Sequence, residues 1–250
     1  MSSVFGRFFS GNKTEHTDFS ALGADMHAHI IPGIDDGSQD VATSIAMIKG
    51  LQELGFSKFI STPHIMPGVF NNDEENIRAA TELLNQSAPK ETGTTVQYAA
   101  EYYIDDDFPQ MVNSGKPLLT FGDQYVLVEA NMMSRTRNME EALFELRLRG
   151  LRPILAHVER YPYMYEHHRL DQYEKLRDAD VLLQVNLRSF TGNYGEIQKR
   201  IARHLADAGM ISFLGTDLHN PAQLAIIRES MLDQHVQNLL KSGDLLNNTL

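Results

Sequence analysis

Short apolar segments alternate with amphipathic segments of helical spacing along most of this 250-residue chain. The apolar segments end on histidine or carboxylate residues, beginning with Asp25-Met26-His27-Ala28-His29. As a strand, this stretch would place Asp25, His27 and His29 on one face, because side chains alternate with a period of two. Strands that alternate with helices imply βαβ units and a parallel sheet. The pattern therefore restricts the chain to an α/β fold.

The sequence predicts seven βα units. Strands are expected near 25–29, 58–64, 95–103, 124–129, 153–157, 181–186 and 211–219, and helices near 40–55, 73–88, 138–149, 169–179, 195–208 and 221–240. In an open doubly wound sheet, ligands collect where the strand order reverses. In a barrel, all carboxyl-terminal strand ends face one mouth. Because the strands end in chemically useful residues throughout, we expect a closed or nearly closed barrel.

One large domain suits this length. We expect it to span residues 24–241, between a loosely held N-terminal arm over 1–23 and a short tail over 242–250. The arm carries Phe5, Phe8 and Phe9, which we expect to pack on the domain rather than on a partner or a membrane surface.

The composition excludes several classes of function. The chain has no cysteine, so disulfides, thiolate metal sites and cysteine-based phosphatase chemistry are excluded. Its net charge of -11 argues against binding to nucleic acid or to anionic membranes, which need a basic surface. No apolar run is long enough for a signal peptide or a membrane span, so we expect a cytoplasmic protein.

The residues at the strand ends form a candidate metal centre. They are His27, His29, His64, Glu101, Glu129, His157, Asp217 and His219, with Asp35 and Asp36 in the first loop. Histidine and carboxylate ligands suit Zn, Mn or Fe, and the share of carboxylates favours the harder ions. The set is too large for one ion. Two or three ions joined by bridging carboxylates are the usual machinery for phosphate ester hydrolysis.

Other polar residues receive no role in this prediction. Asn186, at the end of the sixth expected strand, is interpreted as an ordinary polar residue. The histidines outside the strand ends are interpreted as surface or packing residues; they are His16, His167, His168, His204 and His235.

These motifs resemble the PHP (polymerase and histidinol phosphatase) superfamily. The resemblance rests, in chain order, on Asp25-Met26-His27-Ala28-His29 with Asp35-Asp36-Gly37, Thr62-Pro63-His64, Ala100-Glu101-Tyr102, Val128-Glu129, His157-Val158-Glu159-Arg160-Tyr161 and Thr216-Asp217-Leu218-His219. It covers roughly residues 24–220. Within the superfamily the chain is most similar to the metal-dependent bacterial protein-tyrosine phosphatases of capsular and exopolysaccharide gene clusters.

The resemblance implies a distorted seven-stranded, TIM-like (β/α)7 barrel that holds three divalent metal ions, commonly manganese, with Fe, Zn, Co or Mg as other candidates. One ion would be held by His27, His29, Glu101 and Asp217, a second by bridging Glu101 with Glu129 and His157, and a third by Asp36, His64 and His219. Asp35 competes with Asp36 for the last role. Arg160 would grip the phosphate, because a planar guanidinium makes bidentate contacts. Arg160, Asp217 and His64 are the expected catalytic residues.

The chain departs from the family pattern at two places. Relatives often have proline where Val158 stands, and many carry an arginine shortly after the Asp-x-His motif, where this chain has Asn220-Pro221-Ala222-Gln223-Leu224. Arg228 is a candidate substitute for that arginine. Phe70 and Tyr161 could flank a phosphotyrosine ring or simply cover the rim of the barrel.

We expect hydrolysis by in-line attack of a metal-bridging hydroxide on phosphotyrosine. By resemblance, the substrate would be the tyrosine-rich tail of an autophosphorylating bacterial tyrosine kinase that controls capsular or exopolysaccharide synthesis. The alternatives are a phosphomonoesterase of small molecules such as a histidinol phosphatase, and a non-catalytic barrel stabilised by its metals. A metallo-amidohydrolase fits less well, because no lysine lies near these strand ends.

Overall fold

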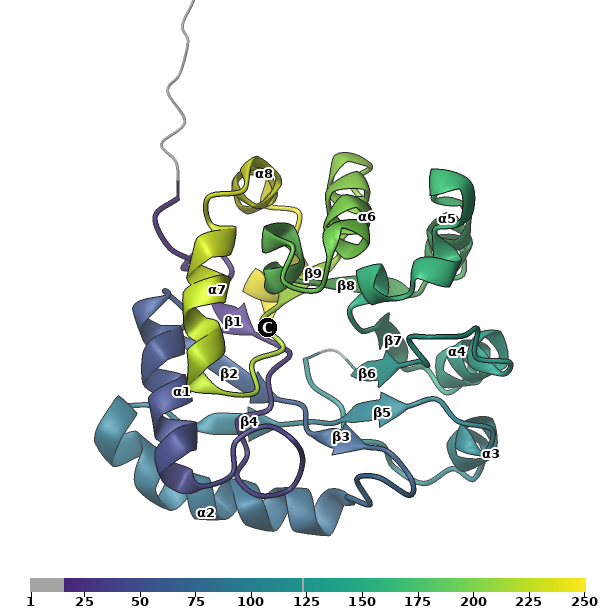
Figure 1. Ribbon diagram of the computed structural model, residues 1–250. Coiled ribbons are helices and arrows are strands. Elements are labelled where there is room, and N and C mark those ends of the chain that lie inside the picture. The colour runs from purple at the N-terminus through teal and green to yellow at the C-terminus, as the bar shows by residue number, and fades with distance from the viewer. Residues whose placement is uncertain (1–15, 123) are drawn as a thin grey trace, which may run out of the picture.

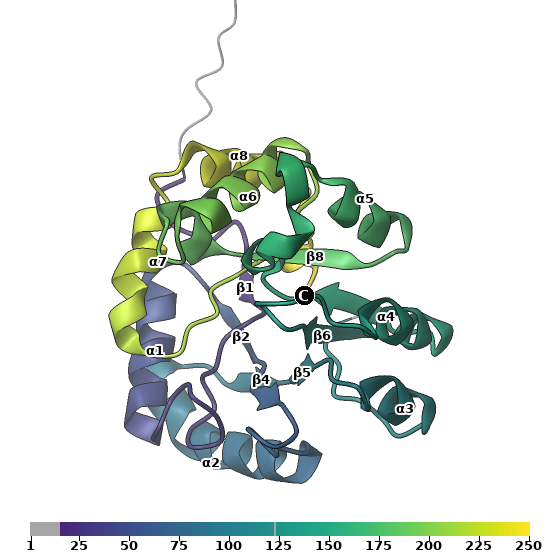
Figure 2. The same cartoon turned by 45° about the vertical axis from the view of Figure 1, so that its right-hand side comes forward.

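A computed structural model describes residues 16–122 and 124–250. The strands form a curved inner layer with the helices packed outside it, as Figure 1 shows, and the turned view of Figure 2 shows the same arrangement. All pairs of neighbouring strands are parallel. These observations confirm the expected α/β class.

The strands fall into two parallel sheets rather than one. In chain order they are β1 (Ala24–Asp25), β2 (Lys58–Ser61), β3 (His64–Ile65), β4 (Val96–Tyr98), β5 (Glu101–Tyr103), β6 (Tyr125–Glu129), β7 (Arg152–Leu155), β8 (Leu182–Asn186) and β9 (Phe213–Gly215). One sheet has the order β1-β2-β4 and the other has the order β3-β5-β6-β7-β8-β9.

Two expected strands, 58–64 and 95–103, are each interrupted at the same level. β2 pairs with β4 as far as Ser61 and Tyr98, and pairing resumes where His64 meets Glu101. Pro63 lies in the gap and has no N–H group to donate to a neighbouring strand. The interruption divides the sheet in two, and β2 and β4 are followed directly along the chain by β3 and β5, which form the next parallel pair.

The first expected strand is also shorter than predicted. It ends at Asp25. Beyond Asp25 the backbone forms one isolated bridge, between Ala28 and Leu218, with the segment that follows β9. The amide of Asp217 donates to the carbonyl of His27 (2.7 Å), and the amide of His29 donates to the carbonyl of Leu218 (2.9 Å). These contacts bring the region after β1 against the region after β9.

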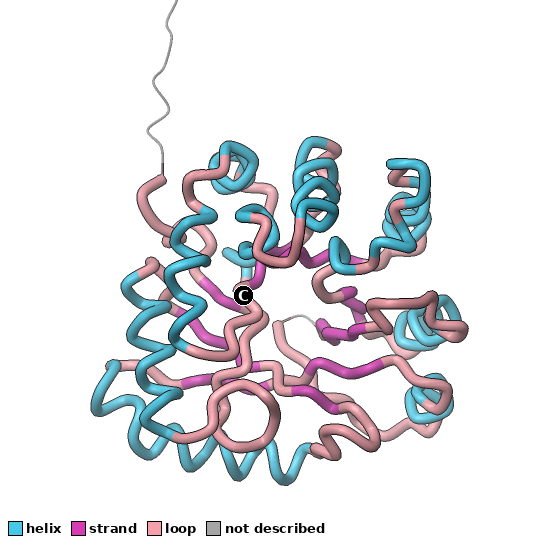
Figure 3. The backbone as a smooth tube through the Cα atoms, in the orientation of Figure 1, coloured by secondary structure: helices cyan, strands magenta, loops and turns pink. Residues whose placement is uncertain are grey.

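Most expected helices are present. The α-helices are α1 (Val41–Glu53), α2 (Glu74–Thr92), α3 (Phe108–Asn113), α4 (Met139–Leu148), α5 (Asp171–Asp178), α6 (Glu196–Asp207), α7 (Leu224–Ser230) and α8 (Gln234–Ser242). Short 3-10 helices, drawn as helix in Figure 3 with the others, are η1 (Val158–Arg160), η2 (Pro162–Met164), η3 (Glu166–His168), η4 (Leu187–Thr191), η5 (Pro221–Gln223) and η6 (Leu246–Thr249). The short α3 was not expected. The single helix expected over 221–240 is wrong: the chain turns between α7 and α8, where Asp233 caps α8 by accepting from the amide of His235 (2.8 Å).

Residues beyond both expected limits of the domain, 24 and 241, pack against it. Phe19 is fully buried, its amide donates to the carbonyl of Leu54, and its ring stacks on Phe56. Near the other end, the side chain of Asn247 is buried and donates to the carbonyls of Ala24 and Leu214. Phe19 and Asn247, on either side of the expected 24–241 domain, therefore both have buried contacts with it. Phe5, Phe8 and Phe9 of the predicted arm lie outside the described residues.

Within the described part of the chain, no helix combines the length and apolar character that crossing a membrane requires.

Candidate metal centre

The structure gathers all nine predicted metal ligands around one mouth at the carboxyl-terminal side of the strands. They are His27 and His29 after β1, Asp36 in the following loop, His64 at the start of β3, Glu101 at the start of β5, Glu129 at the end of β6, His157 after β7, and Asp217 and His219 after β9. The interruptions of the sheet explain why two of them open a strand instead of ending one.

Glu101 lies at the centre of this cluster. Its Oε2 is 3.3 Å from Nε2 of His27, 3.5 Å from Nε2 of His29 and 3.2 Å from Nδ1 of His64. Its Oε1 lies 3.0 Å from Nε2 of His157. Burial raises the pKa of the Glu101 carboxyl, but the surrounding imidazoles outweigh burial and hold this pKa well below its usual range. Glu101 is thus a carboxylate placed to bridge several ligand groups.

Glu129 extends the cluster toward His64 and His157. Its Oε1 is 3.0 Å from Nδ1 of His64, and its Oε2 is 3.7 Å from Nε2 of His157. Glu129 and His157 are both almost fully buried. His64, Glu101 and Glu129 therefore form one compact group of possible ligands, and His27, Glu101 and His157 form another.

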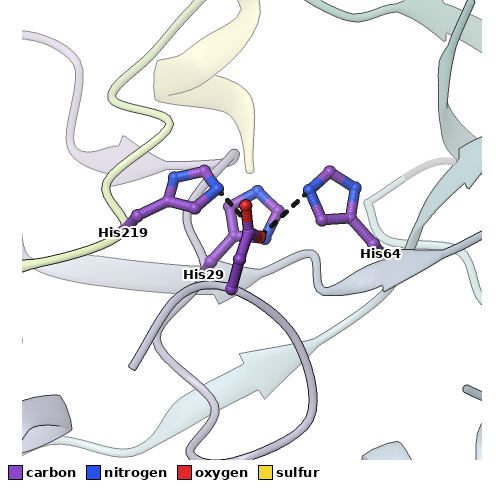
Figure 4. Close-up of side chains that lie close together, drawn as sticks. His29, His64 and His219 are labelled. Atoms are coloured by element: carbon purple, nitrogen blue, oxygen red, sulfur yellow. Dashed lines mark ion pairs between the residues drawn. The ribbon is translucent and has the colours of Figure 1, made fainter. Parts of the chain in front are cut away.

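Asp36 occupies the outer edge of the cluster. Its Oδ1 is 3.5 Å from Nε2 of His64 and 3.4 Å from Nε2 of His219. Figure 4 shows the imidazoles of His29, His64 and His219 close together, and its dashed lines mark the ion pairs of His64 and His219. These four residues form a group with ligand atoms close enough to share one ion.

Asp35 makes different contacts from Asp36. It is buried, and its carboxylate lies 2.7 Å from Nδ1 of His29 and accepts from the amides of Gly37 (2.9 Å) and His64 (3.2 Å). Burial raises the pKa of this carboxyl, but His29 and the other donors more than offset burial and lower it to about 2. Asp35 thus orients the ring of His29, and Asp36 offers the free carboxylate oxygen.

Buried atoms without hydrogen-bond partners test whether metals fit this site. Such atoms include Nε2 of His27, Nε2 of His29, Nδ1 of His64, Oε2 of Glu101 and Oε1 of Glu129. Buried polar atoms normally find partners, so a concentration of orphans in one place calls for an explanation. Each of these atoms can bind a cation. The set of nitrogen and oxygen donors therefore fits a centre with several divalent ions.

The opposite nitrogen of His27 supports the same interpretation. Nδ1 of His27 lies 3.0 Å from Oε1 of Gln184, which also accepts from the amide of His157 (2.8 Å). An amide oxygen accepts only, so Nδ1 of His27 carries a proton and Nε2 is the nitrogen that is left to face the cluster. Metal-binding histidines are commonly oriented in this way.

The predicted substrate contacts lie in different places. The ring of Phe70 stacks on His64 with a centroid distance of 5.3 Å, and Arg160 lies with Nη1 3.4 Å from Oδ2 of Asp217. Tyr161 is fully buried, and its hydroxyl accepts from the amide of Ala130 (3.0 Å). This burial corrects the expectation that the Tyr161 ring flanks a substrate.

Arg228 is not brought to the cluster. It lies exposed on α7, where its Nη2 is 3.9 Å from Oε2 of Glu53 on α1. The proposed substitute for the arginine missing after the Asp-x-His motif therefore lies on the outer helical layer.

Sequence reasoning missed three residues that surround the cluster: Gln184, Arg188 and Tyr194. Gln184 and Asn186 lie on β8, and Arg188 lies just beyond it, buried, with Nη2 donating to the carbonyl of Asp217 (2.7 Å). The available signal was the position of Asn186 at the end of β8 and of Arg188 just beyond it, equivalent to the positions of the predicted ligands on the other strands.

The sequence of this chain matches a known protein family and several of its relatives. A model of the family described as capsular polysaccharide synthesis, CpsB/CapC, matches residues 23–240. The tyrosine-protein phosphatase YwqE of Bacillus subtilis is 30% identical over 204 residues, which cover 78% of this chain and 77% of the relative. The tyrosine-protein phosphatase CpsB of Streptococcus pneumoniae is 27% identical over 204 residues, covering 78% and 82%.

Solved structures give a consistent result. A structure from work on YwqE of Bacillus subtilis and CpsB of Streptococcus pneumoniae, described as unique metal-dependent tyrosine phosphatases, aligns with a TM-score of 0.74 at 28% identity and covers 90% of this chain and 94% of the other. A histidinol phosphate phosphatase from Lactococcus lactis aligns with a TM-score of 0.55 at 17% identity, covering 90% and 94%, and so shares the fold.

Proposed function

The chain belongs to the CpsB/CapC family of capsular polysaccharide synthesis proteins, and on that premise we propose that it is a metal-dependent phosphatase that hydrolyses protein phosphotyrosine. It is thus a phosphoric monoester hydrolase. The observation that carries this proposal is the set of orphaned imidazole and carboxylate atoms that converge beside Arg160. A cluster of cation ligands next to a guanidinium suits an anionic ester.

Three divalent ions account for the ligand groups, with manganese as the first candidate. The first ion would be held by His27, His29, Glu101 and Asp217, the second by Glu101, Glu129 and His157, and the third by Asp36, His64 and His219. Contacts of 3.0 to 3.7 Å within each group support this division. His64 touches two groups, because its Nδ1 faces Glu101 and Glu129 while its Nε2 faces Asp36.

A seven-stranded, distorted barrel is the architecture we propose for this site. The two interruptions support it: counted as single interrupted strands, β2–β3 and β4–β5 reduce nine strands to seven. The parallel bridge between Ala28 and Leu218 supports closure between the first strand and the last.

The side chains of the chain itself position the substrate. Bound divalent ions would supply positive charge and lower the pKa of a water molecule toward neutrality. Arg160, with a quarter of its side chain exposed, would bind the phosphate oxygens and stabilise charge that develops on them. Phe70, stacked on His64 at the rim, would contact the aromatic ring of the substrate. A phenolate is a fair leaving group, with a pKa of about 10, so it needs little protonation.

For the substrate we propose a phosphotyrosine protein, specifically the tyrosine-rich tail of an autophosphorylated bacterial tyrosine kinase. The capsular polysaccharide synthesis family supports this context. We propose that this encounter takes place in the cytoplasm, as expected from the sequence.

Release of phosphate tests the function. The substrates are a Tyr-phosphorylated peptide, a Ser-phosphorylated peptide and histidinol phosphate, each with Mn²⁺, with chelator, and with His27→Ala. We expect release from the phosphotyrosine peptide that needs Mn²⁺ and is lost in the variant. Absence of metal-dependent release from every substrate contradicts the proposal.

The same experiment decides between the alternatives. A much faster rate with histidinol phosphate than with the phosphotyrosine peptide would identify a small-molecule phosphatase. Tight metal binding without turnover of any substrate would identify a barrel that uses metals only for stability.

A further inference from the structure

The two carboxylate oxygens of Asp217 lie in different surroundings. Oδ1 is 3.6 Å from Nε2 of His27 and 3.5 Å from Nε2 of His29, within the metal cluster. Oδ2 accepts hydrogen bonds from Nδ2 of Asn186 (2.8 Å) and from the hydroxyl of Tyr194 (3.2 Å). Donors from the chain therefore occupy Oδ2 and leave Oδ1 to face the cluster.

Tyr194 also contacts two guanidinium groups. The central guanidinium carbons of Arg160 and Arg188 lie 4.5 and 4.9 Å from the centre of its ring. The electron-rich face of a tyrosine ring attracts such cations. Both arginines also lie near Oδ2 of Asp217, at 3.4 Å for Nη1 of Arg160 and 3.5 Å for Nη2 of Arg188. One ring thus gathers two positive charges beside a single carboxylate.

Arg188 and Arg160 differ in their exposure and in the contacts that their guanidinium groups make. Arg188 is buried, with 6% of its side chain exposed, and its Nη2 donates to the backbone carbonyl of Asp217 (2.7 Å). Asp217 has a φ of 49°, a left-handed conformation that costs a non-glycine residue energy and must be held by its surroundings. Arg188 therefore stabilises the backbone turn at Asp217. Arg160, with 25% of its side chain exposed, remains accessible to a ligand.

We propose that Tyr194 is a positioning residue with two separable parts. Its ring holds the guanidinium of Arg160 at the edge of the metal cluster, where it meets the phosphate of the substrate. Its hydroxyl holds Oδ2 of Asp217, so that Oδ1 points at the metal. Arg188 supports both parts by fixing the backbone of Asp217. The inference rests on the proposed function, because that function supplies the anion that Arg160 binds.

Two substitutions separate the parts. Tyr194→Leu removes the ring, and Tyr194→Phe removes only the hydroxyl. The probe is inorganic phosphate, whose binding to the Mn²⁺-loaded protein is measured by calorimetry. We expect Tyr194→Leu to weaken phosphate binding about tenfold, as loss of a partly desolvated cation–π contact implies. We expect Tyr194→Phe to keep phosphate affinity within about twofold while weakening Mn²⁺ binding, measured by competition with a chelating dye.

A double-mutant cycle shows whether the ring acts through Arg160. If it does, Tyr194→Leu changes phosphate affinity less than about twofold in an Arg160→Ala background, because the partner that it positions is gone. Equal effects of Tyr194→Leu in both backgrounds would overturn the proposal.

A second stacked tyrosine supplies a matched control. The ring of Tyr125, at the start of β6, lies 4.6 Å from the guanidinium carbon of Arg152, at the opposite end of this strand from Glu129. Tyr125→Leu is expected to lower the melting temperature and to leave phosphate affinity within about twofold of the wild type. Equal loss of phosphate affinity in Tyr125→Leu and Tyr194→Leu would identify a general structural effect and overturn the proposal.

This test is independent of turnover. A wild-type protein that binds Mn²⁺ and phosphate but releases no phosphate from any ester contradicts the proposed function. The double-mutant cycle still decides whether Tyr194 positions Arg160.

Discussion

Two adjacent aspartates in the first loop illustrate how neighbouring residues take opposite roles. The sequence left open which of Asp35 and Asp36 binds metal. Asp35 accepts hydrogen bonds from two backbone amides and lies against His29, whereas 58% of the Asp36 side chain is exposed and its carboxylate faces His64 and His219. We therefore expect Asp35 to stabilise the protein whether or not metal is bound, and Asp36 to bind the metal.

Substitution of each aspartate by asparagine tests this division. In Asp35→Asn, an amide group would face donors, and an unsatisfied buried group costs about 1–3 kcal/mol. The metal-free protein should then melt about 2–12 °C lower, at roughly 2–4 °C per kcal/mol. Asp36→Asn should leave the melting temperature in chelator unchanged and reduce the Mn²⁺ retained after dialysis, measured by elemental analysis. A lower melting temperature in chelator for Asp36→Asn, together with reduced Mn²⁺ retention for Asp35→Asn, would contradict this division.

Substitution of Gln184 tests how the ring of His27 is oriented, because Oε1 of Gln184 contacts both Nδ1 of His27 and the amide of His157. Gln184→Leu has a similar volume but removes this acceptor, so the ring of His27 loses its orientation. Loss of such outer contacts typically weakens metal binding about 10–100-fold. Calorimetric titration with Mn²⁺ measures the change. Unaltered affinity in a folded variant would show that the contact is dispensable.

The turn between α7 and α8 depends on one carboxylate. Asp233 caps α8 through the amide of His235 and accepts from Nη2 (2.7 Å) and Nε (3.0 Å) of Arg203 on α6. Burial raises the pKa of this carboxyl, but Arg203 and His235 more than offset burial, and the pKa lies below its ordinary value. A carboxyl with a lowered pKa stabilises the fold above its unfolded pKa of about 3.9, and this stability is lost as the pH falls through the folded pKa.

Asp233→Asn keeps a capping oxygen and removes the charge, and Asp233→Ala removes both. We expect Asp233→Asn to lower the free energy of unfolding by about 1 kcal/mol at pH 6 and Asp233→Ala by about 1 kcal/mol more. The difference between wild type and Asp233→Asn should shrink below about pH 4, where the wild-type carboxyl becomes protonated. Urea denaturation in chelator, repeated from pH 6 to pH 3, measures both effects. A difference that is constant with pH would exclude the charge as the cause.

The elements show what could be predicted from the sequence and what could not. Periodicity predicted the α/β class, and the strand-end residues predicted that all nine candidate ligands lie close together, because parallel strand ends meet at the same edge. Interruption of the sheet at Pro63 depends on strand pairing between distant segments, and the turn at Asp233 depends on its contact with Arg203 on α6; periodicity reports neither. Burial of Tyr161 and exposure of Arg228 depend in the same way on the path of the loops.

Within this acidic protein, the charge of the candidate metal centre would depend on whether its metal ions are bound. The chain has a net charge of -11, and the proposed ligands Asp36, Glu101, Glu129 and Asp217 place four of its 33 acidic side chains at one mouth. Three divalent ions would bring six positive charges and make the site locally attractive to phosphate. Without metal, the same mouth would repel its substrate.

The metals would also join the two sheets. His27 and His29 follow β1 of the three-stranded sheet, whereas Glu129 ends β6 and His157 follows β7 of the six-stranded one. Ions that bind only the folded arrangement stabilise it by about 2.7 kcal/mol per site at a hundredfold excess over the dissociation constant. For one such site, chelation should lower the melting temperature by roughly 5–11 °C. Calorimetric scans with Mn²⁺, with chelator, and with chelator followed by excess Mn²⁺ measure the loss and its reversal. A melting temperature that does not respond to chelator would show that the sheets hold together without the metals.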